Sequence, residues 1–107
     1  MRAEVATFLN EYVKRFKALG IDIHSLILFG SQARDTATIA SDIDIAVVMN
    51  HELSSLDRGE LLNLGDDIDM RYEVNLFFTQ KNALENAVDC FDTNKYIREE
   101  GVILWQS

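Results

Sequence analysis

Two apolar runs organise the sequence: Leu26-Ile27-Leu28-Phe29-Gly30-Ser31 and, after an interval of ten residues, Asp42-Ile43-Asp44-Ile45-Ala46-Val47-Val48. The first run is continuously apolar up to its glycine, as in a strand that is buried on both faces. The second run begins with carboxylates at alternate positions, and alternate residues of a strand share one face. The pattern therefore predicts an α/β protein in which a Gly-Ser turn follows one strand and lies near a carboxylate-bearing neighbour.

The turn and the carboxylate pair together predict a site for a metal-bound nucleotide. Gly30 lets the backbone approach a ligand without a Cβ in the way, and Ser31 offers a hydroxyl and an amide. If the next residues begin a short helix, its unpaired N–H groups favour an anion, to which Arg34 adds a permanent charge. Asp42 and Asp44 are expected about 7 Å apart along one strand face and suit a hard divalent cation such as Mg²⁺.

Each part of this pattern also has an ordinary interpretation. A Gly-Ser pair after an apolar strand is often a plain turn, and Asp-x-Asp at the start of a strand is often solvent-facing alternation. The Asp pair could also suggest a hydrolase that forms a phosphoaspartate. In that chemistry, however, Thr or Val is expected where this chain has Ala46, and here the apolar strand follows the carboxylates. The joint occurrence of glycine turn, arginine and paired carboxylates favours the nucleotide site.

The segment Gly30-Ser31-Gln32-Ala33-Arg34, followed by Asp42-x-Asp44, resembles the signature of the polymerase-β-type nucleotidyltransferase superfamily, and by length its minimal nucleotidyltransferase branch. The resemblance implies an α/β (α+β) fold with a small mixed sheet of about three or four strands flanked by helices. It also implies ATP or another nucleoside triphosphate as substrate, Mg²⁺ or Mn²⁺ as cofactor, and transfer of a nucleoside monophosphate to a hydroxyl. Asp42 and Asp44 would then be catalytic metal ligands, and Gly30, Ser31 and Arg34 would bind the nucleotide.

The expected third strand, residues 72–78, departs from the family pattern. The resemblance implies a third carboxylate in an apolar-Asp-apolar triplet, where it completes the metal site and accepts the proton of the attacking hydroxyl. The corresponding triplet is Val74-Asn75-Leu76, so an amide is expected beside the nucleotide. Glu73 shares the strand face of Asn75 and is a candidate catalytic substitute. Both residues can equally be ordinary polar residues of a strand edge.

The resemblance also implies a partner protein. Small members of the family are paired with a helical protein of the HEPN class in toxin–antitoxin modules, where they act as antitoxins. Residues 1–107 are expected to form a single domain without a second domain to bind an acceptor, so the acceptor is expected on another molecule. The alternative is a catalytically impaired binding module that neutralises or scaffolds a partner without transfer, and Asn75 favours that alternative.

The composition disfavours several other classes of protein. The 10 basic and 18 acidic residues give a net charge of −8, which disfavours nucleic-acid binding because phosphate contacts need Lys and Arg. The single Cys90 cannot form an internal disulfide, so a reducing cytoplasm is the expected location. Cys90 itself is expected to be buried beside a helix. No apolar run approaches the length of about 18 residues that a membrane span requires.

The remaining segments predict a helical scaffold. Helices are expected over residues 3–19, about 54–69, 80–90 and 94–100. Gly20 is expected to end the first helix, Ser54 or Ser55 to cap the second and Thr79 the third. Either Asp92 or Thr93 is expected to cap the last. Residues 35–40 are expected to form an exposed loop, and the apolar tail at 102–105 an edge strand or a segment packed under the sheet.

Overall fold

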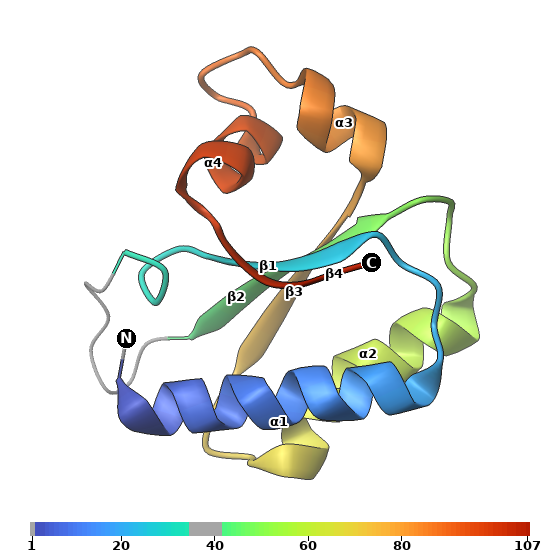
Figure 1. Cartoon of the computed structure of the whole chain (residues 1–107), viewed down its shortest axis with the longest axis vertical. Helices are drawn as coiled ribbons and strands as arrows, with labels where there is room; N and C mark the ends of the chain where they lie inside the picture. Colours follow the sequence, from blue (N-terminus) through green and yellow to red (C-terminus); the bar gives the residue numbers. More distant parts are fainter. Residues whose placement is uncertain (1, 35–41) are drawn as a thin grey trace.

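The computed structural model describes residues 2–34 and 42–107 and arranges them as a four-stranded sheet between two pairs of helices (Figure 1). The elements in chain order are α1 (Ala3–Leu19), β1 (Ser25–Phe29), β2 (Ile43–Met49), α2 (Ser55–Ile68), β3 (Val74–Gln80), α3 (Lys81–Asn86), α4 (Thr93–Glu100) and β4 (Val102–Gln106). The strand order is β3-β2-β1-β4. Strand β1 is antiparallel to β2 and β4, whereas β2 and β3 are parallel. The predicted mixed sheet flanked by helices is confirmed.

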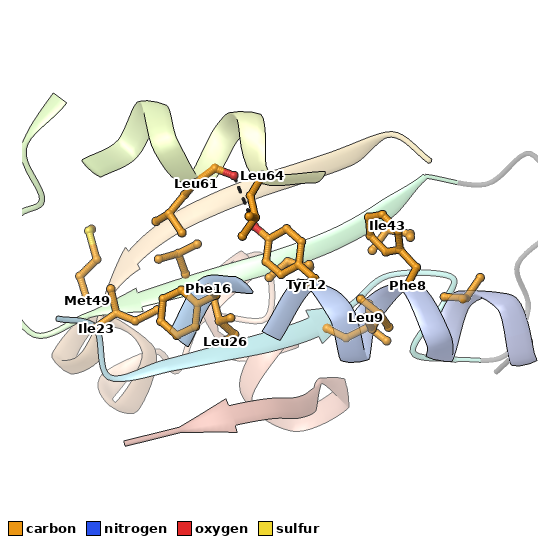
Figure 2. Packing of buried hydrophobic residues seen from close by; sticks show 14 of the residues in the cluster. Phe8, Leu9, Tyr12, Phe16, Ile23, Leu26, Ile43, Met49, Leu61 and Leu64 are labelled. Atoms are coloured by element: carbon orange, nitrogen blue, oxygen red, sulfur yellow. Dashed lines mark hydrogen bonds between the residues drawn. The ribbon is translucent and has the colours of Figure 1, made fainter. Parts of the chain in front are cut away.

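The two faces of the sheet pack against different helices. Because alternate residues of a strand point to opposite faces, β2 contributes to two separate apolar clusters. Ile43, Ile45 and Val47 pack in the larger cluster, with the buried residues of α1 and α2 (Figure 2). Ala46 and Val48 pack in the smaller cluster, with residues of α3 and α4. The same alternation places the side chain of Asp44 on the face that α3 and α4 cover.

Tyr12 joins α1 to α2 inside the larger cluster. Its side chain is fully buried, and its hydroxyl donates a hydrogen bond of 3.4 Å to the carbonyl oxygen of Leu61 (Figure 2). Burial raises the pKa of the Tyr12 phenol well above its ordinary value. Helix α2 also approaches the sheet closely at Gly65, where an added Cβ would lie 2.9 Å from Cγ2 of Val74. This glycine lowers helix propensity but permits the packing of α2 on β3.

The predicted helix ends agree with the structure at several positions. Helix α1 ends at Gly20, which has the left-handed φ of 69° that glycine tolerates best. Ser54 caps α2 by accepting a hydrogen bond of 3.1 Å from the N–H of Asp57. Asp92 caps α4 by accepting one of 2.9 Å from the N–H of Asn94. These side chains satisfy backbone donors that the first turn of a helix leaves unpaired.

The prediction for the segment around Thr79 is wrong. Strand β3 continues to Gln80 because its parallel pairing with β2 extends to the pair Met49 and Gln80. Thr79 therefore belongs to the strand and does not cap α3, whose N-cap residue is Gln80. The buried Thr79 hydroxyl instead donates a hydrogen bond of 2.5 Å to Oδ1 of Asn94, which ties β3 to the start of α4.

The segment after α3 also differs from the prediction. Helix α3 ends at Asn86, so Cys90 lies in the connection to α4 and is exposed, whereas a buried position was expected. The tail forms β4, which confirms the predicted edge strand, and Trp105 packs edge-on against Phe16 with ring centroids 5.1 Å apart. The loop expected over residues 35–40 lies outside the described residues. Across the described segments, no helix combines the length and the apolar character needed to span a bilayer.

Candidate functional site

Three strands bring residues from distant parts of the sequence into one row across the sheet. Phe29 of β1 pairs with Asp44 of β2, and Asp44 pairs with Asn75 of β3. Residues that pair across strands project to the same face. The row therefore lies on the face covered by α3 and α4, where β1 ends and where β2 and β3 begin.

The turn after β1 contacts this row directly. Residues 30–34 form a turn in which the N–H of Arg34 donates a hydrogen bond of 3.2 Å to the carbonyl oxygen of Gly30. Gly30 has a left-handed φ of 76°, and a Cβ added there would collide with Oδ2 of Asp44. Glycine is therefore required both by the backbone conformation and by the carboxylate. Residues 31–34, the last ones described before residue 42, form a turn and not the expected start of a helix.

Asn75 joins the two predicted carboxylates. Its Nδ2 donates hydrogen bonds of 3.2 Å to Oδ2 of Asp42 and 3.3 Å to Oδ1 of Asp44. One oxygen of each aspartate thus accepts from the same nitrogen, although Asp42 precedes β2 and Asp44 lies within it. We call Asp42, Asp44 and Asn75 the carboxylate–amide cluster.

The carboxylate–amide cluster has the donor chemistry for a divalent cation. Oxygens from two aspartates converge, and Mg²⁺ prefers oxygen ligands. Rotation of the Asn75 amide would exchange its nitrogen for a third, neutral oxygen. The residues present therefore fit a hard cation held chiefly by Asp42 and Asp44.

Glu73 lies just before β3 and is exposed. Its backbone carbonyl accepts a hydrogen bond of 2.9 Å from the N–H of Ile43, which fixes the main chain beside β2. Within residues 2–34 and 42–107, no three Asp, Glu, His or Cys side chains are grouped closely enough to hold one metal ion. The role of Glu73 as a substitute for the third carboxylate stays a prediction.

Aromatic side chains border the cluster on the same face. The Phe29 ring lies 6.3 Å from the Phe77 ring and 6.5 Å from the Tyr96 ring, both in edge-on geometry. The guanidinium carbon of Arg34 lies 5.8 Å from the centroid of the Tyr96 ring. Sequence alternation along β3 could have placed Phe77 on the face of Asn75. The position of Tyr96 has no comparable sequence signal, because it depends on how α4 packs on the sheet.

A hollow lies away from this cluster, between α1 and the segment that follows α2. It has a volume of about 630 Å³, and its lining includes Phe8, Lys14, Asp69, Arg71 and Tyr72. The Arg71 guanidinium donates a hydrogen bond of 2.8 Å to the Asp69 carboxylate and holds the pKa of that carboxyl below its ordinary value. Asp69 and Arg71 thus satisfy each other's charges. The paired carboxylates and the glycine turn identify the better candidate site.

A glycine turn beside paired carboxylates on a mixed sheet defines an α/β domain of the nucleotidyltransferase type. The model of the family described as polymerase beta, nucleotidyltransferase matches residues 9–101, and the chain belongs to this family. The resemblance to minimal nucleotidyltransferases inferred from the sequence is thereby confirmed. A comparison with functionally curated proteins found no match.

Several solved structures are similar to this chain. A toxin–antitoxin structure with AMP-PNP is 27% identical, with a TM-score of 0.61 over 91% of this chain and 73% of that chain. A mutant of the MntA–HpeT toxin–antitoxin pair is 24% identical, with a TM-score of 0.62 over 92% and 73% of the two chains. A candidate nucleotidyltransferase from Sulfolobus solfataricus is 20% identical, with a TM-score of 0.58 over 94% and 78%. The last two similarities concern the fold alone.

Proposed function

We propose that this chain is a nucleotidyltransferase of the cytoplasm. It would bind ATP or another nucleoside triphosphate with Mg²⁺ or Mn²⁺ and transfer the nucleoside monophosphate to a hydroxyl on a partner protein. The observation that carries the proposal is the convergence of Asp42 and Asp44 on one point beside the Gly30 turn.

The biological setting that we propose is the antitoxin of a toxin–antitoxin pair. The AMP-PNP in the 27% identical toxin–antitoxin structure supports a nucleoside triphosphate as the ligand. That structure also supports a protein partner. The proposed helical HEPN class of the partner rests on the family resemblance. The net charge of −8 supports a protein acceptor over a nucleic acid, because a polynucleotide would be repelled by this surface.

Asp42 and Asp44 would hold the divalent cation, with Asn75 beside them. A bound divalent cation neutralises phosphate charge and polarises the phosphoryl group. The predicted roles of Gly30, Ser31, Arg34, Asn75 and Glu73 remain part of this proposal.

The residues of the turn would hold the triphosphate. Gly30 has no side chain to block an approaching phosphate, and Ser31 offers its amide and hydroxyl as donors. The planar Arg34 guanidinium can donate two parallel hydrogen bonds to phosphate oxygens. In the transfer, a bond forms between the acceptor oxygen and the α-phosphorus. The bond from the α-phosphorus to the oxygen that it shares with the β-phosphorus breaks. Pyrophosphate leaves, and the proton of the acceptor hydroxyl passes to a base, for which Glu73 is the candidate.

Asn75 favours a second function, a binding module that neutralises or scaffolds its partner without transfer. The amide carries no charge and cannot accept the proton of an attacking hydroxyl. A positioned base contributes about 10²- to 10⁴-fold to a rate. The same fold could therefore bind nucleotide and partner while transfer is slow or absent.

Incubation with ATP labelled on its α-phosphate, Mg²⁺ and the protein encoded next to this chain separates the two functions. An enzyme transfers the label to the partner, and Asp42→Ala abolishes the transfer. Asp66→Ala, which removes an exposed carboxylate of α2 outside the site, is the matched control and retains it. Glu73→Gln tests the proposed base. Binding of the partner without label transfer supports the module. Absence of ATP binding contradicts the enzyme, and absence of partner binding contradicts the module.

A further inference from the structure

Arg34 stands at the end of the Gly30 turn with its guanidinium over an aromatic ring from a distant part of the chain. Its Cζ lies 5.8 Å from the centroid of Tyr96, a half-buried residue of α4. A guanidinium within about 6 Å of a ring face is attracted by about 0.5–1 kcal/mol at an exposed site. Arg34 itself is exposed. The ring therefore restricts a side chain that would otherwise move freely in solvent.

Tyr96 is held in place by its own neighbours. Its ring packs edge-on against Phe29, the residue that precedes the Gly30 turn, with centroids 6.5 Å apart. Phe29 in turn packs edge-on against Phe77 at 6.3 Å. Because Phe29 pairs with Asp44 across the sheet, this packing links the position of the Tyr96 ring to the carboxylate–amide cluster.

The helix that carries Tyr96 is fastened at both ends. At its start, the Thr79 hydroxyl of β3 donates a hydrogen bond of 2.5 Å to Oδ1 of Asn94. Toward its end, the Arg98 guanidinium donates hydrogen bonds to the last carbonyl groups of α3 and its connection, those of Leu84, Glu85 and Ala87. Buried Ile97 packs into the smaller apolar cluster. These contacts make α4 a rigid support for the aromatic ring.

We propose that Tyr96 is a positioning residue that orders Arg34 for the phosphates of the nucleotide. The inference rests on the proposed function. A free arginine side chain loses conformational entropy when it is fixed. Contact with the ring removes part of this freedom before the ligand arrives, and it does not use the N–H donors that bind phosphate. The consequence is tighter binding of the phosphate chain, through the ring and not through the tyrosine hydroxyl.

Isothermal titration of the full chain with ATP and with AMP, both with Mg²⁺, tests this inference. Tyr96→Leu removes the ring and is expected to weaken ATP binding about two- to fivefold, from the usual strength of an exposed cation–π contact. AMP should be affected less, because it has a single phosphate. Tyr96→Phe keeps the ring and is expected to bind ATP like the unaltered chain. Tyr96→Met, a flexible side chain that fills the same space, repeats the test if Tyr96→Leu unfolds.

A double-mutant cycle shows whether Tyr96 acts through the arginine. In an Arg34→Gln background, loss of the ring should cause no further loss of ATP affinity. A further loss in that background, or an equal loss for AMP and ATP, would mean that the ring contacts the nucleoside and would overturn the inference. Weak binding by Tyr96→Phe would overturn it as well. An unaltered chain that binds no ATP contradicts the proposed function itself, so the two failures are distinguishable.

Discussion

Replacing Asn75 by aspartate tests whether the carboxylate–amide cluster is a cation site. In the folded chain, Nδ2 of Asn75 donates hydrogen bonds of 3.2 Å to Asp42 and 3.3 Å to Asp44. Asn75→Asp removes both hydrogen bonds and places a third negative charge next to the other two. It also introduces the carboxylate that the family pattern has at this position.

The expected effect of Asn75→Asp on the free energy of unfolding depends on whether metal is present. At these separations, two like charges in water repel by about 1 kcal/mol per pair, so two pairs cost about 2 kcal/mol. Loss of the two exposed hydrogen bonds adds about 1 kcal/mol. A total of about 3 kcal/mol lowers the melting temperature of a chain of this size by about 12 °C in metal-free buffer. With Mn²⁺ or Mg²⁺ the variant should gain more stability than the unaltered chain, because three carboxylates attract a cation more strongly than two.

Thermal melts near pH 7.5 in EDTA and in increasing Mn²⁺ measure both effects. Asn75→Ala is the matched control, since it loses the same hydrogen bonds without adding a charge. It should lose only about 1 kcal/mol without metal, through those bonds, and it should respond to Mn²⁺ no more than the unaltered chain. If catalysis is limited by the missing carboxylate, Asn75→Asp should also increase label transfer from ATP.

Two outcomes would refute this reasoning. An Asn75→Asp chain that melts like the unaltered chain in EDTA would mean that the three side chains are not in contact. Equal stabilisation of Asn75→Asp and Asn75→Ala by Mn²⁺ would mean that the cation binds elsewhere.

Two further predictions concern Gly30 and Tyr12. Gly30→Ala introduces a left-handed backbone strain of about 1–2 kcal/mol and displaces the Asp44 carboxylate. Gly20→Ala is the matched control, because Gly20 has a similar φ of 69° but no atom within 4 Å of the new Cβ, so this variant introduces the strain alone. Only Gly30→Ala should therefore weaken Mn²⁺ binding in a titration, and equal weakening would contradict the contact. The pKa of Tyr12 is raised above its ordinary 10.0, so the unfolded chain loses the phenolic proton first and stability falls as pH rises above that value. Tyr12→Phe should show a shallower alkaline fall of the free energy of unfolding in urea between about pH 10 and 12, and an unchanged slope would contradict the burial effect.

The strands that carry the site could be predicted because their signals are local. The apolar run up to Phe29 and the alternation after Asp42 are each complete within a few residues. The limits of β3 could not be predicted in this way. Its extension to Gln80 follows from pairing with β2, and Thr79 was equally compatible with a helix cap. Cys90 was misplaced because α3 ends at Asn86, whereas the helix was expected to continue to about residue 90.

The site shows the same division between local and tertiary information. Gly30 could be recognised as a close-approach position, but the group that it approaches, the Asp44 carboxylate, is known only from the packing of β1 on β2. Asn75 could be recognised as a departure from an acidic pattern. That its amide bonds both aspartates required the parallel pairing of β2 and β3, and Tyr96 required the position of α4.

The charge of the chain constrains how it could bind a triphosphate. A protein with a net charge of −8 repels a polyanion at long range, and the carboxylate–amide cluster adds to that repulsion at the site. Under the proposed function, positive charge would be supplied locally, by a cation held by Asp42 and Asp44 and by Arg34, which lies over the Tyr96 ring. ATP binding should accordingly depend strictly on the divalent cation. The choice between enzyme and binding module then depends on Asn75, which occupies the position of the third carboxylate in the family pattern. Its amide lowers the cost of bringing two carboxylates together but supplies no base.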